Sequence, residues 1–176
     1  PSVSVMLSRS EGFASAYRWV FRSQVQIDQS GSPKAIFRRP ASRFVADFVG
    51  ANNILSGSVM GTGTELSLNT AGGEFRCQAN DYEAFCTGDT LDMVISADLV
   101  QISMEDPGTQ NRLHCRFISE EFVGSIVTIF AELEDGSDFK AQTRQRDLAS
   151  MSLEEGVTFF ASWSAADAHL ISADQA

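Results

Sequence analysis

Histidines and closely spaced glutamates are the side chains of this sequence that could carry acid–base chemistry. The candidates are His114, His169, Glu120 with Glu121, Glu132 with Glu134, and Glu154 with Glu155. A general base or a metal site needs several such groups converging on one point. His114 adjoins Cys115 in an expected strand, where neighbouring side chains point to opposite faces, so the two cannot easily bind one ion. We therefore expect neither histidine to be catalytic.

The same alternation gives the acid pairs a structural interpretation. Along the expected strand, Glu132 and Glu134 share one face, and the apolar residues Ile129, Ala131 and Leu133 lie on the other. This is the pattern of a half-solvated sheet. Ser125 lacks the histidine and aspartate that would make it a nucleophile. The sequence thus predicts no catalytic, cofactor-binding or metal-ligating residue.

The sequence also lacks the motifs that bind and hydrolyse nucleotides. It contains no G-x-x-x-x-G-K-(S/T) loop to hold phosphates, and no apolar strand ending in Asp-Glu to hold magnesium. Leu55-Ser56-Gly57 matches the start of the signature Leu-Ser-Gly-Gly-Gln. It lies in an expected strand and the match fails at Ser58, so we interpret it as structural. We expect this chain neither to bind ATP tightly nor to hydrolyse it.

Three cysteines, Cys77, Cys86 and Cys115, have no metal-ligand spacing. An odd number without a secretory signal predicts reduced cytosolic thiols, and we expect all three to be buried small apolar residues. The chain begins at Pro1 without methionine. We take that as a sign of a fragment or of a chain that has lost residues.

Composition and charge limit the possible partners. Of the 176 residues, 43% are hydrophobic, which predicts a packed core, yet no apolar run reaches the roughly 20 residues of a membrane span. The net charge is −10, but residues 1–43 carry seven Arg or Lys and only two Asp or Glu. The remainder is strongly acidic and would repel phosphate backbones. We expect no nucleic-acid partner and no direct membrane insertion.

Residues 32–50 predict two short helices. Ser32 is a candidate N-cap with Pro33 at the first helical position, and Pro40 should end that helix at residue 39. Ser42 is a second candidate N-cap, and Gly50 stands where a left-handed C-cap belongs. The second helix, 42–50, has an apolar face of Phe44, Val45 and Phe48. We expect core packing for this face, or docking onto the following domain or another subunit.

From residue 52 onward, short extended segments alternate with turn residues, as in all-β domains. The expected strands are 54–60, 64–69, 74–78, 91–96, 99–104, 112–120, 125–134, 138–144 and 157–163. Asp135-Gly136 is typical of a tight hairpin turn. The strand count predicts a mainly β fold, an OB-like barrel with an added strand or two, preceded by the two linker helices.

An ordered set of residues across this junction resembles a family of ABC importer ATP-binding subunits. Their motif reads G-x-I-x-Q-I-G-x-P-x-E-I-Y-x-x-P-x-x-x-F-V-A-x-F-(I/V)-G-x-x-N-(L/I/F). The matching residues are Val25, Ile27, Ser32, Pro33, Ile36, Phe37, Pro40, Arg43, Phe44, Val45, Ala46, Phe48, Val49, Gly50, Asn53 and Ile54. Further on, a weaker match to the transport-associated OB (TOBE) domain runs through Asn111, Leu113, Phe117, Phe122 and Gly124.

The resemblance implies three parts of the chain. Residues 1–30 resemble a degenerate end of the ATPase domain, with Leu7, Ser8 and Tyr17 where the family has a switch histidine and two aspartates. Residues 31–51 would be a helical linker, and residues 52–176 an OB-like regulatory domain. The first part is either a decayed or a reading-frame-altered remnant. Members of the family serve polyamines, ferric iron, sulfate, sugars or glycerol phosphate.

The function implied by the resemblance is regulation and dimerisation of an ABC importer ATP-binding subunit. Its partners would be the ATPase domain, the permease subunits and a second copy, held as a weak homodimer through the β domain. It would lie in the cytoplasm at the inner face of the membrane, with ATP and magnesium bound only by a complete parent subunit. The alternative is an OB-type domain that senses a small cation or oxyanion.

Overall fold

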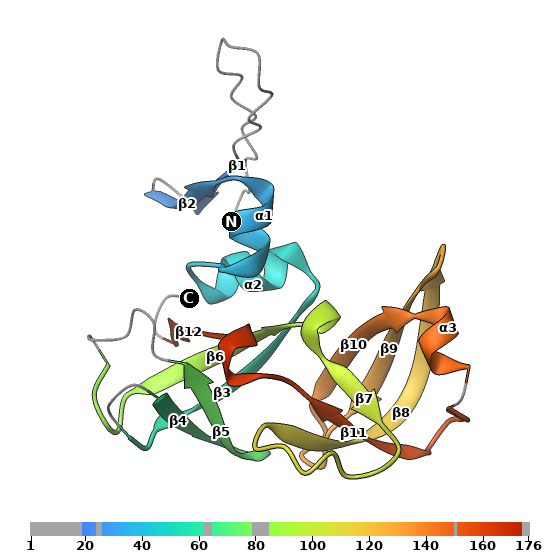
Figure 1. The fold of residues 1–176 in the computed structure, drawn as a ribbon. Coiled ribbons are helices and arrows are strands. Elements are labelled where there is room, and N and C mark those ends of the chain that lie inside the picture. The colour runs from blue at the N-terminus through green and yellow to red at the C-terminus, as the bar shows by residue number, and fades with distance from the viewer. Residues whose placement is uncertain (1–18, 24–25, 62–64, 79–84, 150, 174–176) are drawn as a thin grey trace.

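The computed structural model describes residues 19–23, 26–61, 65–78, 85–149 and 151–173. A helical segment lies above one of two curled β-sheets, and the second sheet lies beside the first (Figure 1). The mainly β, OB-like fold with two preceding helices is as the sequence predicted. The expected counterparts of the ATPase switch residues, at positions 7, 8 and 17, lie outside the described residues.

The N-terminal part is a hairpin followed by two helices. Strands β1 (Trp19–Ser23) and β2 (Gln26–Gly31) pair antiparallel, and α1 (Pro33–Arg38) and α2 (Arg43–Val49) follow. Both expected N-caps form, since Ser32 Oγ accepts from the Ala35 amide at 3.2 Å and Ser42 Oγ from the Val45 amide at 3.3 Å. Gly50 ends α2 with φ 77°, the left-handed C-cap. The hairpin was not predicted.

The first sheet has the order β12-β6-β3-β4-β5. It contains β3 (Asn52–Val59), β4 (Glu65–Thr70), β5 (Gly73–Gln78), β6 (Thr90–Ser96) and β12 (Ala168–Ser172). Its two edge strands, β12 and β5, contact each other, so the sheet curls into a small barrel. We call this sheet the first unit.

The second sheet, which we call the second unit, has the order β10-β9-β8-β11-β7. Its strands are β7 (Gln101–Ser103), β8 (Arg112–Val123), β9 (Ile126–Glu132), β10 (Asp138–Arg144) and β11 (Thr158–Ser162). The short helix α3 (Gln145–Leu148) joins β10 to β11. Its edge strands β10 and β7 also contact each other. The sequence predicted one barrel, whereas the structure has two curled sheets.

The two units exchange their fifth strands. Each has four consecutive strands, and a one-turn 3-10 helix then carries the chain across to the other unit: η1 (Ala97–Leu99) leads to β7 and η2 (Ala165–Asp167) leads to β12. Thr90 begins β6 and Thr158 begins β11, and a serine N-cap followed by alanine begins both 3-10 helices, Ser96-Ala97 for η1 and Ser164-Ala165 for η2. The chain is therefore an internal repeat with swapped strands, which the strand-by-strand prediction missed together with β1, β2, β12 and α3.

One apolar core runs through both units. Trp163 lies at its centre, with its ring centroid 5.1 Å from that of Phe75 in the first unit and 6.1 Å from that of Phe139 in the second. Buried residues from both sheets, including Met93, Ile129 and the residues named above, belong to the same cluster. Because the core is shared, neither unit buries its apolar face alone.

Candidate coupling interface

The linker helices are attached to the first unit by a small apolar contact. Val45 packs against Ile36 inside the helical segment, and both are fully buried. One residue further on, Ala46 packs against Val94 of β6 and Ile171 of β12. The expected docking face was Phe44, Val45 and Phe48, but Phe48 is 49% exposed. The expected core packing is confirmed for Val45 and for Phe44, which packs against it, and is wrong for Phe48. The contact with the sheet is made by Ala46, whose small side chain lets α2 approach closely.

A buried carboxylate lies beside this contact. Asp92 of β6 is completely buried, and Arg43 at the start of α2 reaches it with Nη1 3.1 Å from Oδ2. Ser56 of β3 donates to the other carboxylate oxygen, Oδ1, at 2.6 Å. Arg43 Nη1 also donates to Ser56 Oγ at 3.2 Å, so the three side chains form a closed network. A buried charge needs such pairing, and here the linker supplies the cation.

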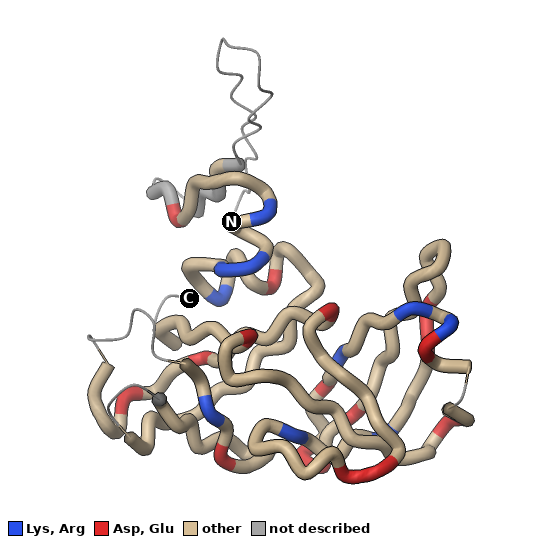
Figure 2. The backbone as a smooth tube through the Cα atoms, viewed as in Figure 1, with Lys and Arg blue, Asp and Glu red and all other residues tan. Residues whose placement is uncertain are grey.

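A second, more exposed ion pair lies at the other linker helix. Arg38 of α1 donates to both carboxylate oxygens of Asp98, at 3.0 and 2.7 Å, and Ser96 Oγ donates to the same carboxylate at 2.7 Å. Asp98 belongs to η1, where the chain crosses from the first unit to the second. The basic residues of the two helices form a distinct group above the sheets (Figure 2). Two of them are thus fixed onto acids of the β region.

Backbone groups of the linker are also held by polar side chains. Asn52 donates to the Ala46 carbonyl at 3.0 Å, and His169 Nε2 lies 3.1 Å from the Pro40 carbonyl oxygen. Gln29 of β2 donates to the Arg39 carbonyl at 2.8 Å and accepts from the Ala41 amide at 2.9 Å. Hairpin, helices and first unit are therefore joined by directional contacts, which favours a rigid linker.

The two β units are bridged by a matched pair of asparagines. Asn53, at the start of β3, donates to the Lys140 carbonyl at 2.8 Å and accepts from the Lys140 amide at 2.7 Å. Asn111, just before β8, makes the same reciprocal bonds with Arg76, at 2.8 and 2.7 Å. Each amide side chain thus acts like a strand neighbour toward the other unit. The sequence marked Asn53 and Asn111 only as members of the two family motifs, and no local signal indicated either bridge.

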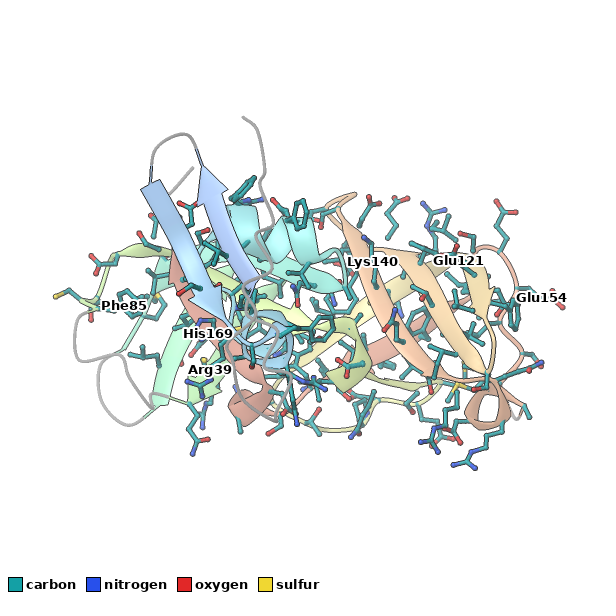
Figure 3. The ribbon with its side chains drawn as sticks, turned by 90° about the horizontal axis from the view of Figure 1, so that it is seen from above. Arg39, Phe85, Glu121, Lys140, Glu154 and His169 are labelled. Atoms are coloured by element: carbon teal, nitrogen blue, oxygen red, sulfur yellow. The ribbon has the colours of Figure 1, made fainter. Side chains whose placement is uncertain are left out.

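The other sequence candidates do not assemble into one site. His114 is exposed and Cys115 buried, as alternation predicted, and His114 Nδ1 lies 3.9 Å from Glu134. Glu132 pairs with Arg116 at 2.9 Å. Glu121 and Glu154 are labelled near one end of the molecule, far from His169 (Figure 3). Within the described ranges, no group of three or more His, Cys, Asp or Glu could hold a metal ion.

The cysteines differ from one another. Cys77 and Cys115 are buried as expected, but Cys86 is exposed, so the expectation of three buried thiols is wrong for Cys86. It follows Phe85 on a polar stretch outside the strands, where no sheet covers it. Burial raises the pKa of the Cys115 thiol to about 12. Cys115 is therefore protonated and unreactive at neutral pH.

Two further features concern the remaining candidates. Leu55-Ser56-Gly57 lies in β3, so the structural interpretation stands, and Gly57 is required because a Cβ there would approach the Asn69 carbonyl oxygen too closely. None of the described helices combines the length and apolar character needed to cross a bilayer.

A hollow of about 490 Å³ lies between the linker helices, lined by Pro33, Lys34, Phe37, Arg38, Phe48 and Val49.

The architecture is thus that of an OB-like β protein with a helical linker, and a solved structure has the same fold. The cytoplasmic molybdate-binding protein ModG, with molybdate bound, aligns with a TM-score of 0.61 at 17% identity. The alignment covers 69% of this chain and 96% of that one. At this identity the likeness concerns the fold alone. Its coverage fits the size of the two β units.

Sequence comparisons identify the kind of domain. The TOBE domain family model matches residues 93–171. The spermidine/putrescine import ATP-binding protein PotA of Lawsonia intracellularis is 28% identical over 92% of this chain and 45% of its own length. The Fe(3+) ions import ATP-binding protein FbpC of Rhizobium etli is 33% identical over 47% of this chain and 24% of its own. Residues 93–171 thus match a TOBE domain, and the chain is similar to ABC importer ATP-binding subunits, of which it spans less than half the length.

Proposed function

We propose that this chain is the regulatory region of an ABC importer ATP-binding subunit. In this proposal, its linker couples the orientation of an ATPase domain to that of the β units. The observation that carries the proposal is the closed network of Arg43, Asp92 and Ser56, which ties α2 to the first unit. A buried, fully paired carboxylate fixes orientation more than it adds stability. The similarity to ATP-binding subunits over 92% of the chain supports the same role.

The partners follow from this role. An ATPase domain would attach through the helical segment, and permease subunits would hold the assembly at the cytoplasmic face of the membrane. In a complete subunit, pairing of the ATPase domains would raise the effective concentration of the contact between two β regions. Without that tether, a second copy would pair only weakly. The chain itself would contribute no catalytic residue, and ATP with magnesium would bind to the complete parent subunit.

A chimera tests the regulatory role. This chain would replace the matching C-terminal 45% of the Lawsonia protein, in cells that depend on that subunit for spermidine uptake. We expect uptake with the chimera, and reduced uptake at unchanged ATP hydrolysis when Arg43→Met breaks the network. Arg116→Met, which breaks an ion pair with Glu132 away from the linker, is the matched control. A folded chimera whose uptake ignores the Arg43 change would contradict the proposal.

Sedimentation tests the weak homodimer. With a net charge of −10, two copies repel, and added salt screens that repulsion over about 10 Å near 0.1 M. We expect a concentration-dependent dimer that strengthens from low to moderate salt. A strict monomer under all conditions would remove the homodimer from the proposal without affecting the linker role.

A small-molecule sensor is a second candidate, favoured by a separate hollow of about 140 Å³ where the two units meet. Its lining includes His114, Glu134 and Asp135, together with Arg112, whose charge is already paired with Asp106 at 2.8 Å. This balance suits a small cation better than an oxyanion. Titration calorimetry with spermidine and with molybdate tests both ligands. Binding of molybdate alone would reverse the stated preference.

A further inference from the structure

The outer half of β8 has one unoccupied edge. Strand β11 pairs with β8 from Arg112 to Arg116, and the last bonds on that side join Phe117 to Val157 and Gly156. The register with β9 shifts between Phe117 and Ser119, and from Ser119 to Val123 β8 pairs with β9 alone, with no other strand of the described chain along it. A strand edge of about five residues, roughly 17 Å long, is therefore open to pairing.

The hairpin geometry identifies which backbone groups face outward. Val123 pairs with Ile126 across the two-residue turn, so these residues exchange both of their hydrogen bonds. The next such pair is Glu121 with Thr128. Phe122, between these two pairs, and Glu120, on the far side of Glu121, consequently direct their N–H and C=O groups away from β9. These are the groups that an additional strand would bond.

An apolar groove lies beside this edge. A hollow of about 490 Å³ is lined by Glu120, Phe122, Arg146, Leu148, Met151 and Leu153. Phe122 is 52% exposed, and the neighbouring Val123 and Ile126 are 67% and 39% exposed. Large apolar side chains gathered at an open strand edge are typical of a surface that binds an extended peptide.

The charges around the groove indicate which kind of segment could bind there. Residues 118–126 and 144–155 contain five carboxylates and two arginines, a net charge of −3. Arg146 lies 3.5 Å from Asp147, its own neighbour. A second copy that paired antiparallel through the outward groups of Glu120 and Phe122 would set Glu121 against the same residue of its partner, which is unfavourable. A basic segment would meet opposite charges instead.

We propose that the open edge of β8 binds an extended peptide segment of a partner protein in which basic and apolar residues alternate. The segment adds a strand beside residues 119–123, bonds the outward groups of Glu120 and Phe122, and places apolar side chains against Leu148 and Met151. Its apolar side chains share the face of Glu120 and Phe122, and its basic side chains lie on the opposite face, beside Glu121. The site lies in the second unit, separate from the linker, and does not depend on the proposed coupling role.

A synthetic peptide tests the proposal. A blocked octapeptide of alternating lysine and valine is titrated into the full chain, with the same peptide carrying glutamate for lysine as its control. Amide NMR signals should shift at residues 119–123, and fluorescence anisotropy should give saturable binding for the lysine peptide only. Equal binding of both peptides, no saturable binding, or shifts confined to other residues would overturn the proposal.

Two variants locate the contact. Glu121→Lys should weaken binding of the lysine peptide roughly fivefold, because it replaces a cross-strand attraction by a repulsion, whereas Glu105→Lys, an equal charge change elsewhere, should not. Phe122→Pro removes one outward N–H while sparing the bonds to β9, and should weaken binding about tenfold. Unchanged affinity in a folded Glu121→Lys variant would refute the site. Self-association that protects the same amides without peptide would show that a second copy is the occupant.

Discussion

The two β units have the same topology but use the third residue of equivalent strands differently. In β6 of the first unit this residue is Asp92, fully buried and paired with Arg43 of the linker. In β11 of the second unit it is Phe160, whose ring lies 5.2 Å from that of His114. The comparison indicates that the repeat supplies the scaffold, and that single positions on it adapt one unit to the linker and leave the other with apolar and open surfaces.

The asparagine bridges give the sharpest test of this equivalence. Asn53→Ala and Asn111→Ala should each lower the free energy of unfolding by about 3 kcal/mol, because each removes two hydrogen bonds and leaves backbone groups of the other unit unpaired. Urea unfolding measures both, with the exposed Asn69→Ala as a control that should change little. A cost for one asparagine several times that for the other would show that the units are not energetically equivalent.

The two ion pairs of the linker should differ in their contribution to the free energy of unfolding. Arg43→Met leaves the buried Asp92 carboxylate with Ser56 alone, and should cost about 2 kcal/mol. Arg38→Met breaks a pair whose side chains are 39% and 35% exposed, and should cost less than about 1 kcal/mol. Thermal unfolding of the two variants gives the comparison. Adding Asp92→Asn to Arg43→Met should recover part of the loss, and a further decrease would contradict the account of a buried unpaired charge.

The end of α2 is a smaller, local contribution. Gly50 has φ 77°, so Gly50→Val forces a β-branched residue into the left-handed region and should cost about 1 kcal/mol or more. Gly61 lies in open space without a positive φ, and Gly61→Val is the matched control with little expected effect. Equal stability of the two variants would mean that the left-handed cap does not contribute.

Local signals in the sequence predicted more than nonlocal ones did. The caps at Ser32, Ser42 and Gly50 act within a few residues, and all three form. Strand β12 was missed because its five residues pair with β6, more than seventy positions away, and the exchange of β7 and β12 has no local signature. For the interface, Arg43 was noticed within a family motif, but Asp92 was not, since its burial and its partners depend on which strands come together.

The turn after the second strand of each unit provides the smallest and most specific comparison. In the first unit, Thr70 Oγ1 accepts from the Gly72 amide at 3.2 Å and donates to the Gly73 carbonyl at 3.0 Å. In the second unit, Asp135 accepts from the amide and the hydroxyl of Ser137, at 2.9 and 2.6 Å. The side-chain hydrogen bond from Ser137, followed by that from its backbone, lowers the pKa of Asp135.

Only the second turn should therefore respond to acid. Because the folded pKa of Asp135 lies below its unfolded value near 3.9, its contribution is present above that value and is lost as pH falls through the folded pKa. The stability difference between wild type and Asp135→Ala should shrink between pH 6 and about pH 2.5, whereas that for Thr70→Ala should stay constant. Urea unfolding at both pH values measures the two differences. The Thr70→Ala difference should not change, because a neutral hydroxyl does not titrate in this range. A Thr70→Ala difference that varied with pH as strongly as that of Asp135→Ala would contradict the distinction between the two turns.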